Sequence, residues 1–440
     1  MQIEKNLNSQ ARKRLELLFD DSEYTEIGSY VKEKDNLTGV ITAFGTVYGT
    51  PVYAFSQDKT VENGAVGAAQ AEKIKKIFEL AAKTGVPVVG IHDSNGAFID
   101  GSAKSLSAYG EMLNVSSQIS GVVPQISVIA GSCVGCAALL AASSDFIIMS
   151  ENGEIGMSTL CEKSDKTKLV SAVCKSDEDA INKTRDLISI LPMNNLEGPH
   201  IQVFSEPAAE YTGDFAGIAS AVCDANSVVE LSENTGKASY TALATISGQT
   251  VGIVATNKTN DKLTSEDTSK IARFVRTCDA FAIPVITFVD TEGFDKEGID
   301  GVKALTQLSA SYSEATTAKI SIITGKCIGS SFIALAGKNV SADFTFAFEN
   351  ASIAPMEPLA AVEFLWHDKL AGAADITAKR NELANEYLST LASAESAAND
   401  GAVDDIIAPA DTRSTIVSAL HMLEGKRVQK LPKKHNNIPF

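Results

Sequence analysis

The sequence predicts an α/β fold that occurs twice in tandem. Near-continuous apolar runs of strand length alternate with amphipathic helical segments, which is the pattern of a parallel sheet covered by helices. The same order of segments occurs in both halves of the 440-residue chain. At roughly 100–200 residues per domain, this length accommodates at least two domains.

Matching stretches reveal the repeat. GVPVVGIHDSNGAF at 85–98 resembles AIPVITFVDTEGF at 282–294, and PQISVIAGSCVGCA at 124–137 resembles AKISIITGKCIGSS at 318–331. Asp145-Phe146 then matches Asp343-Phe344, in the same order along the chain. We therefore expect two copies of one domain, residues 1–220 and 221–440, with the boundary in the polar stretch around 195–235.

Each copy is expected to begin with a β-hairpin, at 46–55 in the first half and 240–255 in the second. Amphipathic helices follow at 65–85 and 265–281, and Gly85 stands where a helix C-cap is expected. The apolar segments VPVVGIHD and IPVITFVD predict strands buried on both faces. A glycine turn, a helix, a second apolar strand, another glycine turn and a small-residue helix complete each copy. Right-handed β-α-β crossovers are expected.

The composition excludes several classes of protein. Lys and Arg total 38 against 55 Asp and Glu, a net charge of −17, and a chain this acidic without a strong basic patch would repel nucleic acid. The seven cysteines are an odd number spread thinly, which favours a reducing compartment. Cys133 and Cys136 form a CxxC without a second pair, so no metal site is expected. The charged start and the absence of a long apolar window predict a cytoplasmic protein.

The recurring glycine turns are the candidate functional feature. In the first half they are the segments 93–97 and 131–138, and in the second half 290–294 and 325–331. A turn from a buried strand into a helix can expose backbone N–H groups, and two such turns together can hold an oxyanion or an enolate oxygen. The alternative is that glycine simply permits tight turns.

Other chemistries lack their residues. The sequence contains no GxxxxGK[ST] loop, no GxGxxG after a strand and no GxSxG elbow. Cys133 and Cys327 hold equivalent positions and are expected to be packed small residues rather than nucleophiles. The histidines are scattered and form no HxxxH pair: His92, His200, His367, His421 and His435.

At these segments the chain resembles the carboxyltransferase component of biotin-dependent acyl-CoA carboxylases and decarboxylases, of the propionyl-CoA carboxylase beta and methylmalonyl-CoA decarboxylase alpha types. The stretches that carry the resemblance are VYAFSQDKTVENGAVGAAQAEKI (52–74), VPVVGIHDSNGA (86–97), GVVPQISVIAGSCVGCAALLAASSDFIIM (121–149), IPVITFVDTEGF (283–294) and the tail 401–440. The resemblance implies two tandem crotonase-like (ClpP/crotonase) β-β-α domains.

The resemblance also implies an activity, the transfer of a carboxyl group between biotin and an acyl-CoA through an enolate. Propionyl-CoA and methylmalonyl-CoA are the leading substrate pair, and the acyl-CoA would bind to the first domain. Carried over residue by residue, the first oxyanion hole would use the backbone N–H groups of Gly135 and Cys136. Gly96 and Ala97 would bind substrate beside it.

The second domain would receive biotin. Its oxyanion hole would use Gly329, Ser330 and Ser331, with Gly293 and Phe294 as binding neighbours. Because the chain has no Met-Lys-Met biotinylation site and no ATP-binding loop, biotin would arrive on a separate biotin carrier protein. The resemblance also implies a homo-hexamer, a trimer of antiparallel dimers with sites between neighbouring subunits. It allows a biotin carboxylase or membrane decarboxylase subunits as further partners.

The chain departs from the family pattern at the turns. The family's Gly-Gly reads Gly135-Cys136 and Gly329-Ser330, its Arg is replaced by Phe98, and residues 293–298 lack the usual Pro-Gly. Two alternatives stay open. One is another crotonase-type enzyme, an acyl-CoA hydratase or isomerase, which would need carboxylates near the first hole, where only Asp93 and Asp100 are candidates. The other is a weakened or non-catalytic paralogue that serves as a structural subunit.

Overall fold

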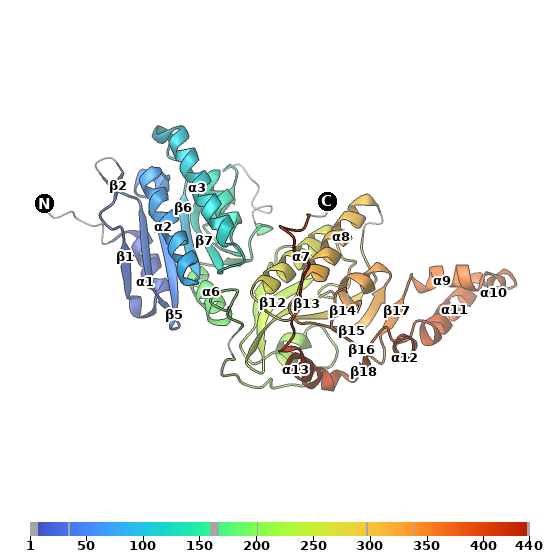
Figure 1. Cartoon of the computed structure of the whole chain (residues 1–440). Helices are drawn as coiled ribbons and strands as arrows, with labels where there is room; N and C mark the ends of the chain where they lie inside the picture. Colours follow the sequence, from blue (N-terminus) through green and yellow to red (C-terminus); the bar gives the residue numbers. More distant parts are fainter. Residues whose placement is uncertain are drawn as a thin grey trace. The chain divides into compact units, whose positions relative to one another are not determined.

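The computed structural model of the chain (Figure 1) describes residues 8–33, 36–158, 167–199, 201–295, 298–338 and 340–437. Cys161, His200, Lys296 and Glu297 lie outside these residues. The chain forms two compact units, Met1–Pro199 and His200–Phe440. Residues 201–220, which were expected in the first domain, belong to the second unit because Tyr211 and Ile218 are part of its hydrophobic core.

The first unit is built on one mixed sheet in the order β1-β4-β5-β6-β7-β8-β10, with β9 beside β7. Strands β4 and β5 form the antiparallel hairpin, which starts earlier than expected, at Val40. Strands β5 to β8 are mutually parallel, as predicted. The strands are β1 (Tyr24–Ile27), β4 (Val40–Val47), β5 (Thr50–Gln57), β6 (Val88–Ser94), β7 (Gln125–Val134), β8 (Phe146–Ser150), β9 (Glu154–Gly156) and β10 (Ala172–Cys174), and β2 (Lys32–Glu33) pairs separately with β3 (Asn36–Leu37).

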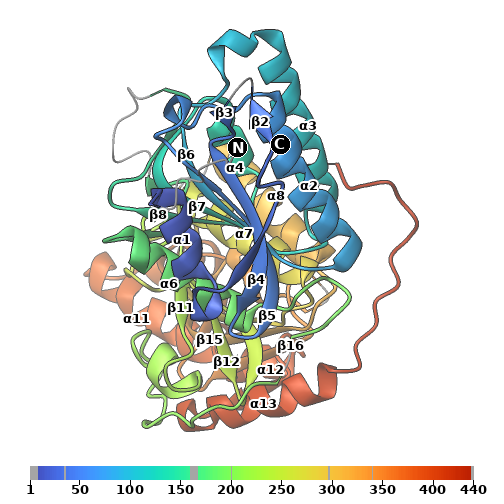
Figure 2. The same ribbon diagram turned by 90° about the vertical axis from the view of Figure 1, so that its left-hand side faces the viewer.

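Helices cover both faces of this sheet, and Figure 2 shows α1 and α6 on one side of β4 and β5, with α2 and α3 on the other. Ile74, Ile77 and Met112 are fully buried in the core beneath α2 and α3. Helix α2 ends as predicted, because Gly85 has φ 68° and its N–H donates to the Ala81 oxygen over 2.8 Å. The helices are α1 (Gln10–Leu18), η1 (Asp20–Ser22), η2 (Glu62–Gly64), α2 (Ala68–Thr84), η3 (Ile99–Gly101), α3 (Ala103–Ile119), α4 (Cys136–Ala142) and α6 (Asp177–Ile190).

The second unit repeats this topology, which confirms the predicted duplication. Its sheet runs β11-β12-β13-β14-β15-β16-β18, with β17 beside β15. The strands are β11 (Val229–Leu231), β12 (Tyr240–Ile246), β13 (Gln249–Ala255), β14 (Val285–Thr291), β15 (Lys319–Ile328), β16 (Phe344–Phe348), β17 (Ser352–Ala354) and β18 (Asp405–Ile407). Helices η4 (Ile218–Val222), α7 (Ser265–Ala280), α8 (Ile299–Glu314), η5 (Phe332–Ala336), η6 (Pro409–Asp411) and α13 (Thr412–Leu423) accompany this sheet.

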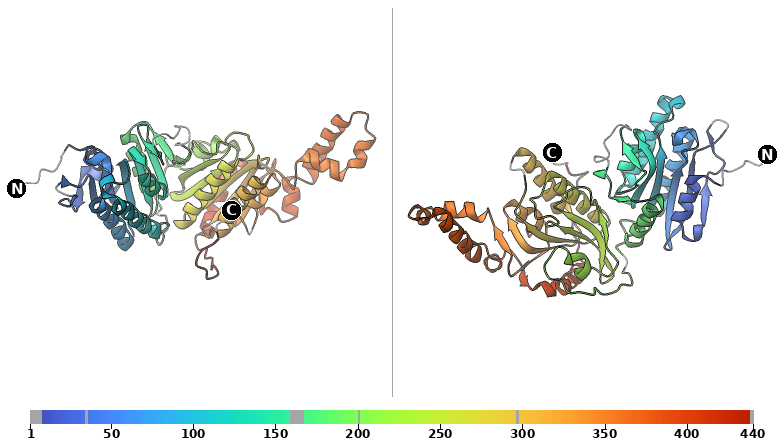
Figure 3. Two further views of the ribbon diagram at one scale, coloured as in Figure 1. Left: turned by 90° about the horizontal axis from the view of Figure 1, so that it is seen from above. Right: turned by 180° about the vertical axis from the view of Figure 1, so that it is seen from behind.

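A group of helices without a counterpart among the described residues of the first unit follows β17 and extends away from its sheet, as the orange segment of Figure 3 shows. It comprises α9 (Pro358–Leu365), α10 (His367–Ala371), α11 (Ile376–Thr390) and α12 (Ala394–Asn399). Val362, Leu383 and Tyr387 form its own small core. Among the helices that the structure describes, none is both long and apolar enough to cross a membrane.

Candidate active site

The first glycine turn follows β6 at the carboxyl edge of the sheet. Gly96 has φ 94°, a conformation that disfavours any residue with a Cβ, and its N–H donates to Ser94 Oγ over 3.1 Å. The Val66 N–H donates to the Gly96 oxygen (2.8 Å), and the Phe98 N–H donates to the Val66 oxygen (3.0 Å). In this parallel bridge the residue between them, Ala97, directs its own N–H away from Val66. Ala97 is half-buried, and no described residue accepts from its N–H, so this group is available to a ligand.

The second part of this turn follows β7. Gly135 has φ 62° and ψ −125°, and its N–H donates to the Gly156 oxygen over 3.0 Å. Cys136 begins α4, where N–H groups have no acceptor within the helix, and its own N–H has no partner among the described residues. A Cβ added to Gly96 would lie 3.9 Å from the Cys136 nitrogen. The N–H groups of Ala97 and Cys136 therefore belong to one turn region.

The second unit builds the same arrangement after β14. Gly293 has φ 112°, and its N–H donates to Thr291 Oγ1 over 3.2 Å. The Leu263 N–H donates to the Gly293 oxygen, and the Asp295 N–H donates to the Leu263 oxygen, both over 3.0 Å. Phe294 is the central residue of this bridge, so its N–H points away from Leu263, as that of Ala97 points away from Val66.

In the turn after β15, the N–H of Gly329 again donates a hydrogen bond within the fold. The Gly329 N–H donates to the Ala354 oxygen over 2.7 Å, and no described residue accepts from the N–H of Ser330. Ser331 is completely buried, and its hydroxyl donates to the Ile328 oxygen over 2.7 Å. Ser331 therefore serves the turn internally, whereas the exposed Ser330 is in a position to meet a ligand.

The oxyanion-hole residues expected from the sequence stay a prediction, and the hydrogen bonds of the fold show which of their N–H groups are already engaged. The amides of Gly135 and Gly329 stabilise the fold, so the available pairs are Ala97 with Cys136 and Phe294 with Ser330. Ala97 and Phe294 were expected only as binding neighbours; their place between two bridging hydrogen bonds left no sequence signal beyond the adjacent glycine. Neither Cys136 nor Ser330 has a positive φ, so replacing the family's second glycine introduces no backbone strain.

The buried carboxylate of Asp93 stabilises the first turn. Asp93 accepts hydrogen bonds from the Ser132 N–H (3.2 Å) and from Arg14 Nη1 (3.1 Å), and both charged side chains of this pair are more than nine-tenths buried. A Cβ at Gly131 would lie 2.1 Å from Asp93 Oδ1, so only glycine fits there. Asp93 is thus held in an ion pair and Asp100 is exposed, an arrangement that does not supply the carboxylate pair of a hydratase.

Asp290 plays the same part in the second unit. Its Oδ1 accepts from the Lys326 N–H over 2.8 Å, and a Cβ at Gly325 would lie 2.4 Å from that oxygen. The surface charges differ between the units: Lys326 Nζ pairs with Glu292 over 2.6 Å, and this contact lowers the pKa of the Glu292 carboxyl. In the first unit Lys59 Nζ instead donates to the hydroxyl of Ser132 over 3.2 Å.

The equivalent cysteines pack beneath the turns. Cys133 and Cys327 are completely buried, and burial raises the pKa of both thiols, that of Cys327 to about 12. A buried thiol of high pKa is a poor nucleophile, which confirms the expectation of a packing role. Within the described parts of the chain, no group of three or more His, Cys, Asp and Glu side chains could hold a metal ion.

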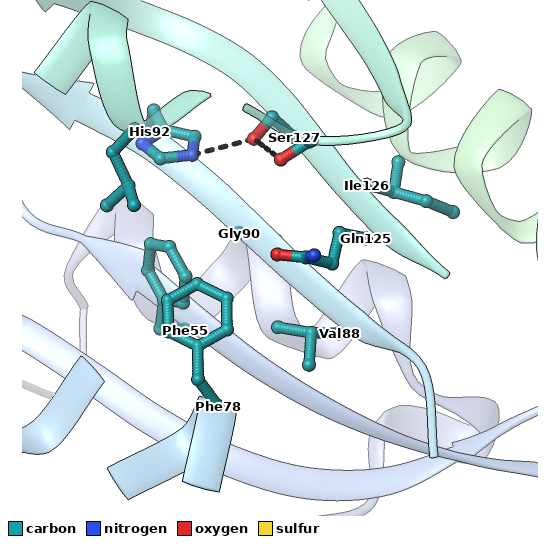
Figure 4. Close-up of a pocket in the computed structure, with 10 residues that line it drawn as sticks. Phe55, Phe78, Val88, Gly90, His92, Gln125, Ile126 and Ser127 are labelled. Atoms are coloured by element: carbon teal, nitrogen blue, oxygen red, sulfur yellow. Dashed lines mark hydrogen bonds between the residues drawn. The ribbon is translucent and has the colours of Figure 1, made fainter. Parts of the chain in front are cut away.

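A separate cavity lies within the core of the first unit (Figure 4). His92 Nε2 and Ser127 Oγ are hydrogen-bonded over 3.0 Å, and Ser127 continues to Ser144 over 2.8 Å. The ring of Phe55 meets the imidazole edge-on, with centroids 5.3 Å apart. Burial lowers the pKa of His92 to about 4, so the imidazole is neutral at pH 7. Neither Ala97 nor Cys136 lines this cavity, which is distinct from the turn.

Comparison with known proteins assigns the chain to a family, because the profile of the carboxyl transferase domain matches residues 5–161 and 155–438. The chain belongs to the carboxyl transferase family. It is 34% identical to the methylmalonyl-CoA decarboxylase subunit alpha of Propionigenium modestum, over 98% of this chain and 93% of that protein. It is 33% identical to the propionyl-CoA carboxylase carboxyltransferase subunit of Haloferax mediterranei, with the same two coverages.

A solved structure supports the family at the level of the fold. Transcarboxylase 12S, with methylmalonyl-coenzyme A and methylmalonic acid bound, superposes with a TM-score of 0.91 and 32% identity, covering 98% of this chain and 92% of that one. The expected crotonase-like tandem fold is thereby confirmed. Transcarboxylase 12S itself forms a hexamer assembly.

Proposed function

We propose that this carboxyl transferase family member moves a carboxyl group between biotin and an acyl-CoA, with methylmalonyl-CoA and propionyl-CoA as the substrate pair. The observation that carries the proposal is the pair of N–H donors at equivalent turns of both units. Two donors of this kind can stabilise one enolate-type oxygen, and this reaction has two such oxygens, one on each reactant. Family membership supports the chemistry, and the names of the relatives support the substrates.

The first unit binds the acyl-CoA in this proposal. When the carboxyl group leaves the α-carbon, negative charge moves onto the thioester oxygen. The N–H groups of Ala97 and Cys136 are directed by the fold before substrate arrives, so they stabilise this charge with little reorganisation. Arg14 and Asp93 take no part in proton transfer and instead keep the strand ends at a fixed separation.

The second unit receives biotin, which carries the transferred carboxyl group on a ureido nitrogen. Phe294 and Ser330 fit a ureido oxygen because their N–H groups repeat the geometry of the first turn. Gly293 supports this turn through its φ of 112°, a conformation that L side chains rarely adopt. In this proposal Phe294 and Ser330 have one role, which is to bind the ureido oxygen of biotin while negative charge develops on it.

The proposal extends to partners and location. The transfer needs both kinds of turn at one site, and we propose that a hexamer, a trimer of antiparallel dimers, supplies this arrangement between neighbouring copies. The hexamer assembly of transcarboxylase 12S supports this arrangement. We further propose a separate biotin carrier protein, a biotin carboxylase or decarboxylase subunits as partners, and a location in the cytoplasm or at the surface of a membrane complex.

The first test is to mix the purified protein with free biotin and, separately, the carboxylated thioesters methylmalonyl-CoA, malonyl-CoA and glutaconyl-CoA, with propionyl-CoA, which has no carboxyl group to donate, as a negative control. We expect biotin-dependent loss of the carboxyl group from methylmalonyl-CoA, which is measured by chromatography of the thioesters. Reactions without biotin are the control. A protein shown by light scattering to be assembled, yet inactive on every thioester, would refute the proposal and favour the non-catalytic paralogue.

The paralogue alternative has its own test, the double substitution Cys136→Gly with Ser330→Gly. Because neither residue has a positive φ, we expect the restored glycines to change activity little. A large gain from an inactive wild type would indicate that these two side chains have disabled the turns.

A further inference from the structure

A basic segment follows the last helix of the second unit. Residues 426–437, which we call the basic segment, come after α13 and contain neither helix nor strand, and Figure 2 shows this red stretch clear of the other elements of its unit. The segment holds five of the 38 basic residues of the chain and none of the 55 acidic ones. The remaining 33 basic residues are outnumbered by all 55 acidic residues, so the segment has the opposite charge to the rest of the protein. Its basic residues are Lys426, Arg427, Lys430, Lys433 and Lys434.

The start of the basic segment is anchored on the second unit. Lys426 Nζ donates to Asp343 Oδ2 over 2.7 Å and to the Thr317 oxygen over 2.8 Å. Lys430 Nζ lies 4.0 Å from Asp279 Oδ2, at the limit of an ion pair. These contacts hold the start of the segment against the stretches of chain that precede β15 and β16.

The remainder of the basic segment lacks such contacts. Among the described residues, no hydrogen bond or ion pair joins 431–437 to the rest of the chain, and His435 Nδ1 lies 3.1 Å from the Asn436 oxygen within the segment itself. Leu431 is 85% exposed, and every basic side chain after Lys426 is exposed. An extended stretch costs conformational entropy to order, and its like charges repel one another. A surface of opposite charge that covers the segment would stabilise it.

The charge of the chain favours a second copy as the partner. Nucleic acid and anionic lipid would attract the segment, but the acidic excess of the rest of the chain repels both. On a second copy, the same acidic excess attracts the segment. Within its own copy, the carboxylates that the segment meets are Asp343 and Asp279, which pair with Lys426 and Lys430.

We propose that the basic segment binds an acidic surface of a second copy of this chain through Arg427, Lys433 and Lys434, while Lys426 anchors it to its own copy. This inference deepens the proposed hexamer and rests on that part of the proposed function. A net charge of −17 opposes self-association, and a contact between unlike charges offsets part of that repulsion. Leu431 lies between the cations and would lose its exposed area in the same contact.

The test is the triple substitution Arg427→Gln, Lys433→Gln and Lys434→Gln, which leaves both contacts of Lys426 in place. Assembly is measured by sedimentation velocity over a range of protein concentrations at about 0.1 M NaCl, where charges within about 10 Å still interact. We expect the protein concentration at which half of the assembly dissociates to rise about tenfold, the combined effect of three exposed ion pairs. Circular dichroism checks that the triple variant is folded.

A matched control makes the same change in net charge at exposed lysines outside the segment, with Lys76→Gln, Lys83→Gln and Lys237→Gln. We expect this variant to assemble as the wild type does. A peptide with the sequence of residues 426–440, added in excess to the wild type, should compete with the segment and promote dissociation. The same peptide with its five basic residues replaced by glutamine should have no effect.

Equal dissociation of the triple variant and the control variant, from a wild type that is assembled, would overturn the inference. Binding of the wild type to vesicles of phosphatidylcholine and phosphatidylserine, lost in the triple variant while assembly is unchanged, would overturn it in favour of a lipid surface. A wild type that is monomeric at every concentration would overturn both this inference and the proposed hexamer. Because these measurements contain no thioester, a failure of the proposed carboxyl transfer is seen separately, in the thioester assay.

Discussion

Cys136→Pro is the sharpest test of the backbone donors, because it deletes one N–H at a position that tolerates proline. Cys136 is the first residue of α4, where proline is favoured, and no described residue accepts from its N–H. The preceding Gly135 amide stays bonded to Gly156, so the turn keeps its anchor. With that N–H deleted, only the N–H of Ala97 is left to stabilise the charge that develops on the thioester oxygen. Loss of one such donor costs about 10²–10³ in kcat, or roughly 3–4 kcal/mol.

The assay is biotin-dependent decarboxylation of methylmalonyl-CoA, with kcat and KM determined for each variant. Cys136→Ala is the matched control because it removes the thiol and keeps the N–H, and we expect it to remain within about threefold of the wild type because the donor itself is retained. Ser330→Pro, with Ser330→Ala as its control, makes the equivalent change at the second turn. If Cys136→Pro folds normally and matches Cys136→Ala in kcat, the Cys136 N–H is not an oxyanion donor.

Three further predictions concern the framework beneath the turns and the core cavity of the first unit. Gly131→Ala would place a Cβ 2.1 Å from Asp93 Oδ1, and we expect a loss of about 1–3 kcal/mol in unfolding free energy, measured by urea titration. Arg14→Met would leave the buried Asp93 carboxylate without its cation and should cost about 3–5 kcal/mol; an unchanged urea midpoint would contradict the bracing role. The pKa of His92 is about 4 in the folded protein, against an ordinary value near 6.5. The imidazole is therefore neutral in both states above pH 6.5, and the free energy of unfolding decreases as the pH falls from 6.5 to about 4, because the unfolded chain binds the proton first. His92→Gln should abolish that part of the acid sensitivity, about 3 kcal/mol, in pH-dependent melts.

The sequence by itself determined the duplication, the alternation of strands and helices and the location of both glycine turns. These features are local: an apolar run of strand length, a helical period and a glycine at a helix end each depend on residues close together in the chain. The hairpin at β12 and β13, the cap at Gly85 and the packed cysteines followed from such patterns. The resemblance to the carboxyltransferase family supplied the expected reaction, which these local patterns do not show.

Only the tertiary structure decided which backbone N–H groups remain available. The Gly135 amide is taken by Gly156 and the Gly329 amide by Ala354, because the short strands β9 and β17 return to pair with β7 and β15. The support of the first turn comes equally from distant residues, since Arg14 reaches Asp93 from 79 positions earlier in the chain. A sequence pattern shows where an amide is placed, but whether it is free depends on acceptors that folding brings from elsewhere in the chain.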